Sequence, residues 1–219
     1  MNGVAFFDLD RTLLDVNSGT LWLRHEWRQG RLGLPDAVRA TWWLTRYALG
    51  HGDLDHALAH AASVYAGDPE AEIRQRVEAW FAERIAGRLR PGAVEALAHH
   101  RTRGDVLVLA STSSQYAARC AMRLYGLDDA VSTELEAQDG RLTGRLAASG
   151  FGAAKLARCA AWAEAHGVAL ADTTFYTDSY TDLPLLEQVG HPVVVCPDRR
   201  LAREAVRRGW PVQDWGRAA

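Results

Sequence analysis

Lysine is nearly absent from this chain of 219 residues: Lys155 is the only one, and arginine supplies every other basic side chain. An excess of one charge is also missing, because acidic and basic residues nearly balance to a formal net charge of -2 at pH 7. A balanced chain lacks the basic footprint of a nucleic-acid-binding protein. No apolar run approaches the roughly 18 residues that a membrane span requires. We therefore expect neither nucleic acid nor a membrane to be the main partner.

Cysteine is scarce as well. The three cysteines, Cys120, Cys159 and Cys196, lie far apart and form neither a zinc-binding spacing nor a disulfide framework. The chain opens on an apolar segment, without the basic and then apolar stretch that is typical of a signal peptide. These absences favour a reducing compartment, and we expect a cytoplasmic protein. No pattern in the sequence indicates its oligomeric state.

Four short apolar runs are typical of strands that are buried on both faces. They lie at Val4–Leu9, Val106–Ala110, Thr173–Thr177 and Pro192–Cys196. Helical patterns accompany the last three, at Pro91–Arg103, Ser114–Tyr125, Ala153–His166, Thr181–Val189 and Leu201–Arg208. The alternation predicts an α/β fold, a Rossmann-like parallel sheet with helices on both faces. An Asp139-Gly140 pair between strand-like arms also predicts a small antiparallel hairpin that leaves the main sheet, to which we assign no chemical role.

The segment from residue 16 to 88 interrupts this alternation with helical patterns alone. They lie at Gly19–Gln29, Asp36–Leu49, Leu54–Tyr65 and Glu70–Ala86, and glycine and proline separate them. We therefore predict a core made of residues 1–15 and 89–219, and an all-helical cap, residues 16–88, inserted after the first strand. Because the insertion leaves from the carboxyl end of that strand, the cap should lie beside the residues that end it.

Two carboxylates end the first strand one residue apart, at Asp8 and Asp10. Residues i and i+2 of an extended chain face the same side, so the two would point together unless the strand breaks between them. At about 4 Å and an effective dielectric near 20, such a pair repels by roughly 4 kcal/mol. The pair therefore requires a nearby cation, a metal ion or a lysine. Taken alone, it is equally typical of a solvated turn.

The other predicted strands also end in polar residues. The second is followed by Ser111 and Thr112, and the third by Asp178, with Asp182 four residues later. Ligands of open α/β sheets bind outside the carboxyl ends of the strands. Lys155 begins the helix before the third strand, and a compact ammonium suits a phosphate or a carboxylate. We therefore predict one cleft that gathers carboxylates, hydroxyls and the single lysine.

These segments, in this order, resemble the four motifs of the haloacid dehalogenase superfamily of phosphatases. The residues are Asp8-Leu9-Asp10-Arg11-Thr12, then Ser111, then Lys155, then Asp178-Ser179-Tyr180-Thr181-Asp182. The helical insertion, the hairpin and the segment Asp182-Leu183-Pro184-Leu185-Leu186 are similar to the branch, subfamily IB, that includes phosphoserine phosphatases and histidinol-phosphate phosphatases.

The resemblance implies a Mg²⁺-dependent phosphatase. Asp8 would attack phosphorus to form an aspartyl-phosphate, and Asp10 would be the general acid and then the general base. Mg²⁺ would be held by Asp8, by the backbone carbonyl of Asp10, by Asp178 and by water. Asp182 would be an outer-shell metal residue or the partner that orients Lys155; a helix N-terminal acid without such a role is the alternative.

The resemblance also implies a phosphate site. Ser111 and the backbone N–H groups of Leu9, Asp10 and Thr112 would hold the phosphate oxygens, and Lys155 would balance the charge. Thr12 is expected to cap the turn behind the nucleophile. Two departures from the family pattern stand out. Asn17 occupies a position where phosphoserine phosphatases carry an acid that reads the substrate amine, and Thr177 replaces the usual glycine before Asp178.

The cap is expected to choose the substrate, a small phosphorylated metabolite. Asn17 ranks histidinol phosphate ahead of phosphoserine. Arg24 and Arg28, one helical turn apart, could meet a substrate carboxylate or a second phosphate, or form a solvated face. Of the eight histidines, His25 and His56 are the candidates to face the cleft, although a surface or packing role is favoured for both. Two alternatives stay open: a phosphotransferase or mutase, and a binding protein with a vestigial site whose cap rests on a partner or membrane through its tryptophans, Trp22, Trp27, Trp42, Trp43 and Trp80.

Overall fold

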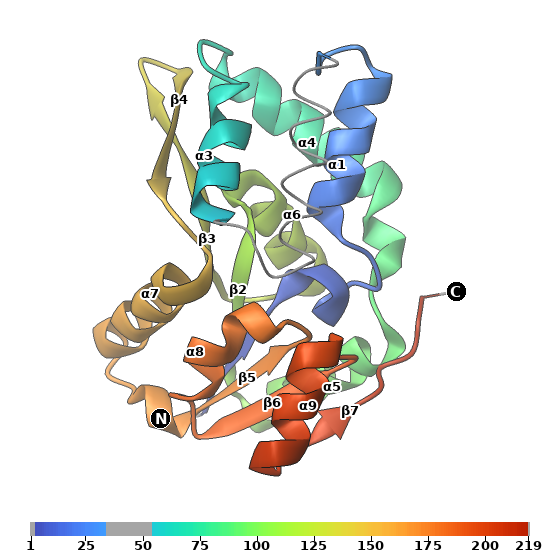
Figure 1. Cartoon of the computed structure of the whole chain (residues 1–219), viewed down its shortest axis with the longest axis vertical. Coiled ribbons are helices and arrows are strands. Elements are labelled where there is room, and N and C mark those ends of the chain that lie inside the picture. The colour runs from blue at the N-terminus through green and yellow to red at the C-terminus, as the bar shows by residue number, and fades with distance from the viewer. Residues whose placement is uncertain (1–2, 34–53, 219) are drawn as a thin grey trace.

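The strands of the computed structural model, which describes residues 3–33 and 54–218, form one sheet with seven strands in the order β4-β3-β2-β1-β5-β6-β7 (Figure 1). Neighbouring strands are parallel in the described chain except β3 and β4, which form an antiparallel hairpin. The strands are β1 (Val4–Phe7), β2 (Val106–Ser114), β3 (Asp129–Gln138), β4 (Arg141–Ala148), β5 (Thr173–Thr177), β6 (His191–Val195) and β7 (Val212–Gln213). The predicted α/β fold is confirmed.

Helices cover both faces of the sheet and one of its ends. They are α1 (Ser18–Arg28), α3 (Leu54–Ser63), α4 (Glu70–Arg84), α5 (Pro91–Arg103), α6 (Gln115–Tyr125), α7 (Gly152–Ala165), α8 (Leu183–Leu186) and α9 (Arg199–Arg208). Short 3-10 turns lie at Ala86–Arg88, Leu170–Asp172 and Tyr180–Asp182. The predicted helix Asp36–Leu49, with Trp42 and Trp43, lies outside the described residues. None of the described helices combines the length and apolarity that crossing a membrane requires.

The alternation of side chains along β1 creates the two halves of the core. Phe7 points to the face covered by α5 and α6, where it stacks on Tyr176 with ring centroids 4.7 Å apart. Phe6 points to the opposite face, where it meets Trp162 of α7 edge-on at 5.6 Å. Because successive strand residues face opposite sides, a short run of buried residues serves both layers.

Four details of the sheet differ from the sequence prediction. Strand β1 ends at Phe7 instead of Leu9, and β2 continues through polar residues to Ser114. The first half of β3 is an additional core strand, paired in parallel with β2 from Val108 and Asp129 onward. Its few apolar residues lie among polar ones, which hides a buried strand from a search for apolar runs. Strand β7 was missed because it is a two-residue exposed edge.

The described cap helices α1, α3 and α4 lie together beyond the carboxyl ends of the central strands (Figure 1). The chain leaves and returns at neighbouring points, because Leu14 and Leu89 form an antiparallel bridge and Arg88 forms an ion pair with Asp15 at 2.8 Å. We propose that these two contacts, Leu14–Leu89 and Asp15–Arg88, mark the boundary between core and cap.

The β3–β4 hairpin reaches from the core to the cap. The Gly67 N–H donates to the Leu142 carbonyl at 2.8 Å, and the Glu70 N–H donates to the Gly140 carbonyl at 2.9 Å. The hairpin was expected to have no chemical role, and these main-chain bonds are structural: the hairpin braces the segments that follow α3 and begin α4 against the core.

Candidate active site

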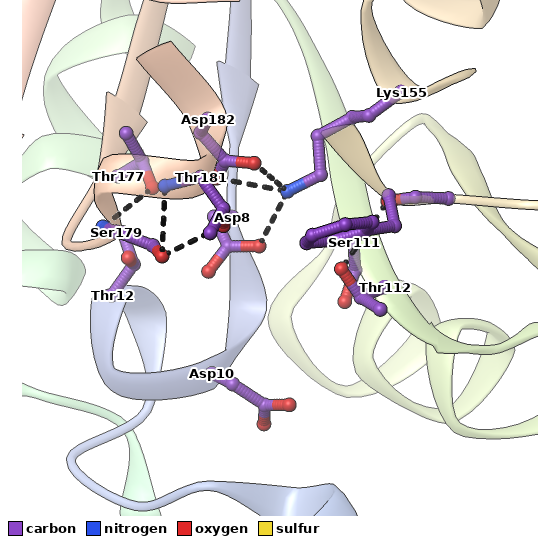
Figure 2. Close-up of polar contacts among 12 residues, drawn as sticks. Asp8, Asp10, Thr12, Ser111, Thr112, Lys155, Thr177, Ser179, Thr181 and Asp182 are labelled. Carbon is purple, nitrogen blue, oxygen red and sulfur yellow. Dashed lines mark hydrogen bonds and ion pairs between the residues drawn. The ribbon is translucent and has the colours of Figure 1, made fainter. Parts of the chain in front are cut away.

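A sharp turn after β1 separates the two aspartates of the first motif. The Asp8 N–H donates to the Tyr176 carbonyl at 2.9 Å, which keeps Asp8 in the sheet, and the chain then folds back over Leu9–Leu13. Arg11 has φ of 61°, a left-handed conformation that is rare outside glycine. Asp8 and Asp10 therefore do not share one face, and Figure 2 shows the two carboxylates directed differently.

Lys155 joins Asp8 to Asp182. Its Nζ lies 3.1 Å from Asp8 Oδ1 and 2.8 Å from Asp182 Oδ1, and the lysine side chain is almost completely buried (Figure 2). Thr177 Oγ1 donates to Asp182 Oδ2 at 2.7 Å and accepts from the Ser179 N–H at 3.2 Å. Of the roles open to Asp182, this geometry matches the partner that orients the lysine. The part of Thr177 was not foreseen, although its departure from the usual glycine was the available signal.

Thr12 binds the third-strand aspartate. Its hydroxyl accepts from the Asp178 N–H at 2.9 Å and lies 3.3 Å from Asp178 Oδ1. Thr12 was expected to cap its own turn, and the structure instead uses it to tie that turn to the end of β5. The tie places Asp178 beside Asp8.

Asp10 is held from the cap and from β2. The Ser18 N–H, at the start of α1, donates to Asp10 Oδ1 at 2.7 Å, and Ser113 Oγ donates to Asp10 Oδ2 at 3.2 Å. Burial is the largest influence on this carboxyl and raises the pKa of Asp10, although these hydrogen bonds act in the opposite direction. A raised pKa suits a carboxyl that must deliver a proton near neutral pH. Sequence reasoning missed Ser18 and Ser113.

The other two carboxyls of the site are also perturbed. The pKa of Asp8 is raised to about 7. Burial is the largest cause, Lys155 acts against it, and the charges of Asp182 and Asp10 add to the rise. Burial and then the charge of Asp8 raise the pKa of Asp178 well above its ordinary value. Lys155 stays protonated, because the two aspartates beside it outweigh its burial and raise its pKa. A single lysine therefore does not fully neutralise this cluster.

The end of β2 supplies the predicted hydroxyls. Ser111 is buried against the cavity, and its Oγ accepts from the Ser113 N–H at 3.1 Å. Thr112 Oγ1 donates to the Gly150 carbonyl at 3.3 Å. A Cβ on Gly150 would lie 2.2 Å from the Ser111 carbonyl oxygen, so only glycine allows the segment before α7 to approach β2 this closely.

The remaining predicted residues lie in several places. Leu9 is buried in the core, so it can serve the site only through its main chain. Asn17 lines the cavity and caps α1, its Oδ1 accepting from the N–H and the hydroxyl of Thr20, each at 2.8 Å. Arg24 and Arg28 are exposed, and neither lines the cavity.

Some of the predicted aromatic residues of the cap line the cavity and others do not. His25 stacks on Trp22 with ring centroids 5.6 Å apart, outside the cavity lining. Trp22 and Trp80 meet edge-on at 5.2 Å inside the cap, whereas Trp27 is exposed. The His56 side chain lies outside the described part of the structure.

A cavity of about 340 Å³ lies between the core and the described part of the cap. Its floor contains the acidic cluster, the lysine and the hydroxyls, namely Asp8, Asp10, Ser111, Thr112, Lys155, Asp178 and Asp182. The structure therefore brings together every residue for which the motifs implied a side-chain role at the reaction centre.

The donors on this floor fit the expected Mg²⁺. No cluster of three His, Cys, Asp or Glu side chains suited to a metal occurs among the described residues. The expected set of two carboxylates, Asp8 and Asp178, with the backbone carbonyl of Asp10, needs no such cluster, because Mg²⁺ is bound through one or two carboxylates and keeps several waters. The raised pKa values of both carboxyls mark a place that lacks positive charge.

Comparisons with known proteins agree with this geometry. The family model described as haloacid dehalogenase-like hydrolase matches residues 5–187. A histidinol-phosphatase of Neisseria meningitidis is 30% identical, with 97% of this chain and 98% of the relative covered. A phosphoserine phosphatase of Mycobacterium tuberculosis is 31% identical, with 98% and 71% covered. The crystal structure of a Bordetella pertussis protein of unknown function, 31% identical, superposes with a TM-score of 0.87 over 98% of this chain and 99% of that one. The chain therefore belongs to the haloacid dehalogenase-like hydrolase family, and it is a phosphatase of that family.

Proposed function

We propose that this phosphatase is a Mg²⁺-dependent phosphomonoesterase that works through an aspartyl-phosphate on Asp8. One observation carries the proposal: Asp8 lies at the end of the central strand β1, lines the cavity and binds Lys155 through one carboxylate oxygen, Oδ1. Mg²⁺, when bound, would supply the positive charge that keeps Asp8 ionised and neutralises the phosphoryl oxygens.

In the first step, Asp8 Oδ2 forms a bond to phosphorus as the bond from phosphorus to the alcohol oxygen breaks. Asp10 delivers its proton to that departing oxygen, and Ser18 and Ser113 hold the Asp10 carboxyl in position for this transfer. Ser111 and the N–H of Thr112 bind the phosphoryl oxygens, where charge must be stabilised.

In the second step, water attacks phosphorus and Asp10, now ionised, takes its proton. The bond between phosphorus and Asp8 then breaks, which releases inorganic phosphate and restores the carboxylate. Lys155 remains charged throughout and faces the same Asp8 oxygen in both steps, and the bonds of Asp182 to Lys155 and Thr177 fix its place.

Two relatives are named for substrates, and of these we propose histidinol phosphate ahead of phosphoserine. The Asn17 oxygen is occupied by Thr20, so no acid at this position is ready to pair with the amine that both esters carry. Phosphoserine also brings a carboxylate, which histidinol phosphate lacks, and none of the described cap residues that line the cavity is Lys or Arg. The imidazole ring of histidinol phosphate can instead face the aromatic side chains of the cap, Trp22, Tyr65 and Trp80.

Purified protein incubated with Mg²⁺ and a broad panel of phosphomonoesters tests the proposal. We expect phosphate release that depends on Mg²⁺ and is abolished by Asp8→Asn, with wild-type circular dichroism. Mass spectrometry of acid-quenched protein should show one added phosphoryl group in the wild type and none in the variant. The proposal is contradicted if the folded protein releases no phosphate from any ester of the panel.

A further inference from the structure

The cavity has two chemically different ends. Within the described chain, every Asp, Lys and Arg that lines the cavity belongs to the core: the aspartates and Lys155 lie on the catalytic floor, and Arg11 lies in the turn after β1. The cap side is lined by aliphatic side chains of three helices and their connections: Leu23, Leu32, Leu58, Val64, Ile73 and Val77. Leu135 of the β3–β4 hairpin adds a further apolar group from the core side. An apolar enclosure therefore faces the place where the alcohol part of a phosphate ester must lie.

Several polar groups on the cap side bond to one another, Ser18 bonds to the core, and His60 of α3 adds an imidazole to the lining. Trp22 Nε1 donates to the Tyr65 hydroxyl at 2.8 Å, and the Asn17 oxygen accepts from Thr20. None of the described cap residues that line the cavity is Asp, Glu, Lys or Arg. The exposed Arg24 and Arg28 leave this conclusion unchanged, because neither lines the cavity.

Such an enclosure discriminates between alcohols. A charged ammonium or carboxylate that enters it loses water and meets no Asp, Glu, Lys or Arg among the described cap residues of the lining, which is unfavourable. Each methylene that enters it leaves water, and the expected gain is about fourfold in binding per buried methylene. The cavity volume of about 340 Å³ falls within the range of roughly 300–1,000 Å³ that is usual for small-ligand sites.

We infer that the preferred substrates are phosphate monoesters of apolar alcohols that carry no charged group near the phosphate. The inference rests on the proposed phosphatase activity and names the substrate class of the same site. It places histidinol phosphate and phosphoserine below an uncharged alkyl ester of similar size, and it assigns the selection to the aliphatic wall of the cap.

An isosteric pair of esters gives the sharpest test. Propyl phosphate and phosphoethanolamine differ by a methyl in place of an ammonium, so their size and leaving groups are alike. We expect kcat/KM to be at least tenfold higher for propyl phosphate, and to rise about fourfold per methylene from ethyl toward hexyl phosphate until the cavity is full. Comparing 2-phenylethyl phosphate with octyl phosphate separates an aromatic from an aliphatic alcohol. A higher value for phosphoethanolamine or phosphoserine overturns the inference and leaves the phosphatase proposal intact.

Matched variants locate the selection. Leu23→Gln places a polar group on the cavity wall, and Leu124→Gln makes the same change on the exposed face of α6. We expect Leu23→Gln to lower kcat/KM for hexyl phosphate about tenfold more than kcat/KM for ethyl phosphate, while Leu124→Gln changes neither. Equal loss on both esters, or an unchanged preference in Leu23→Gln, contradicts the assignment to this wall.

Calorimetry with alkylphosphonates decides the inference without turnover. If no ester is hydrolysed, the proposed function fails, but binding still reports on the cavity. We expect affinity to rise from ethyl- to hexylphosphonate and the heat-capacity change of binding to become more negative, because this sign marks burial of apolar surface. A chain-length-independent affinity refutes the apolar site whatever the activity.

Discussion

Thr177 should hold the catalytic lysine in place through Asp182, and replacing it with valine tests this. Valine keeps the shape of threonine but removes the hydroxyl that donates to Asp182 Oδ2 at 2.7 Å and accepts from the Ser179 N–H at 3.2 Å. Both Thr177 and Asp182 are buried, so water cannot easily replace the lost bonds. A lost bond to a charged group costs about 1.5–3 kcal/mol, and the N–H of the half-buried Ser179 also loses its acceptor, so we expect Thr177→Val to be destabilised by about 2–4 kcal/mol.

Thr177→Ser is the matched control. Serine retains both hydrogen bonds and loses only a buried methyl, so we expect a loss of about 1 kcal/mol. Urea unfolding at pH 7 measures both variants, and an unchanged m value shows that the midpoint shift is a change in stability. Wild type, Ser and Val should rank in that order.

Activity gives an independent readout of positioning. Removing an outer partner that orients a catalytic group typically costs about 10–100-fold, and we expect a loss of this size in kcat for Thr177→Val, with a small change in KM. The Ser variant should stay within a fewfold of wild type. The reasoning is refuted if the Val and Ser variants have the same stability and the same kcat.

Three further predictions address the acid, the packing of the site and a buried ionic cluster. Asp10→Asn with p-nitrophenyl phosphate should release a burst of nitrophenolate close to the enzyme concentration, and its steady-state rate should then be lower than that of the wild type by about 10²–10⁴. The reason is that a good leaving group needs no general acid, whereas the attacking water still needs the general base. Stopped-flow absorbance checks this, and equal slowing of both phases contradicts it. Gly150→Ala should lose about 1–3 kcal/mol in thermal or urea unfolding and most activity, because its Cβ would meet the Ser111 carbonyl oxygen, whereas Gly87→Ala, with nothing within 4 Å, should be neutral. Asp105 accepts hydrogen bonds from the Gly3 N–H and from Arg103 and pairs with His100; burial opposes these bonds, but they prevail and lower the pKa of Asp105. A lowered folded-state pKa gives stability that is present above the unfolded pKa, near 3.9, and lost as the pH falls below it; urea midpoints from pH 7 to 3 should therefore fall more steeply in wild type than in Asp105→Asn.

The fold class could be predicted because the buried parallel strands are continuous apolar runs. Elements without such a run were missed. The first half of β3 pairs with β2 in the core although Asp129 opens it and serine and threonine follow, since its neighbours in the sheet supply the burial that its own sequence does not show. Tertiary pairing decided this strand, and local propensity did not.

The candidate site was predictable to the extent that its residues end strands. Asp8, Ser111 and Asp178 follow apolar runs, so their meeting at one edge follows from parallel topology alone. Ser18 and Ser113 could not be found in this way, because Ser113 reaches Asp10 from a segment distant in the sequence and Ser18 acts through its backbone N–H. A backbone N–H such as that of Ser18 is present in every residue type except proline and leaves no trace in a sequence.

In the cap, the sequence predicted the role of the segment but not which residues line the cavity. Its helical sequence patterns indicated a substrate-selecting insertion. Arg24 and Arg28 were candidates to contact the substrate because charged residues are easy to recognise in a sequence. In the structure these arginines are exposed, and the cavity wall is built from apolar residues of the cap such as Leu23, which the sequence alone assigns to packing. The arginines lie outside the cavity lining and the leucine lies within it. The cap should therefore select against alcohols that carry a charge, because the described part of its lining offers no Asp, Glu, Lys or Arg to pair with them. The same aliphatic side chains that pack the cap then set the specificity of the enzyme.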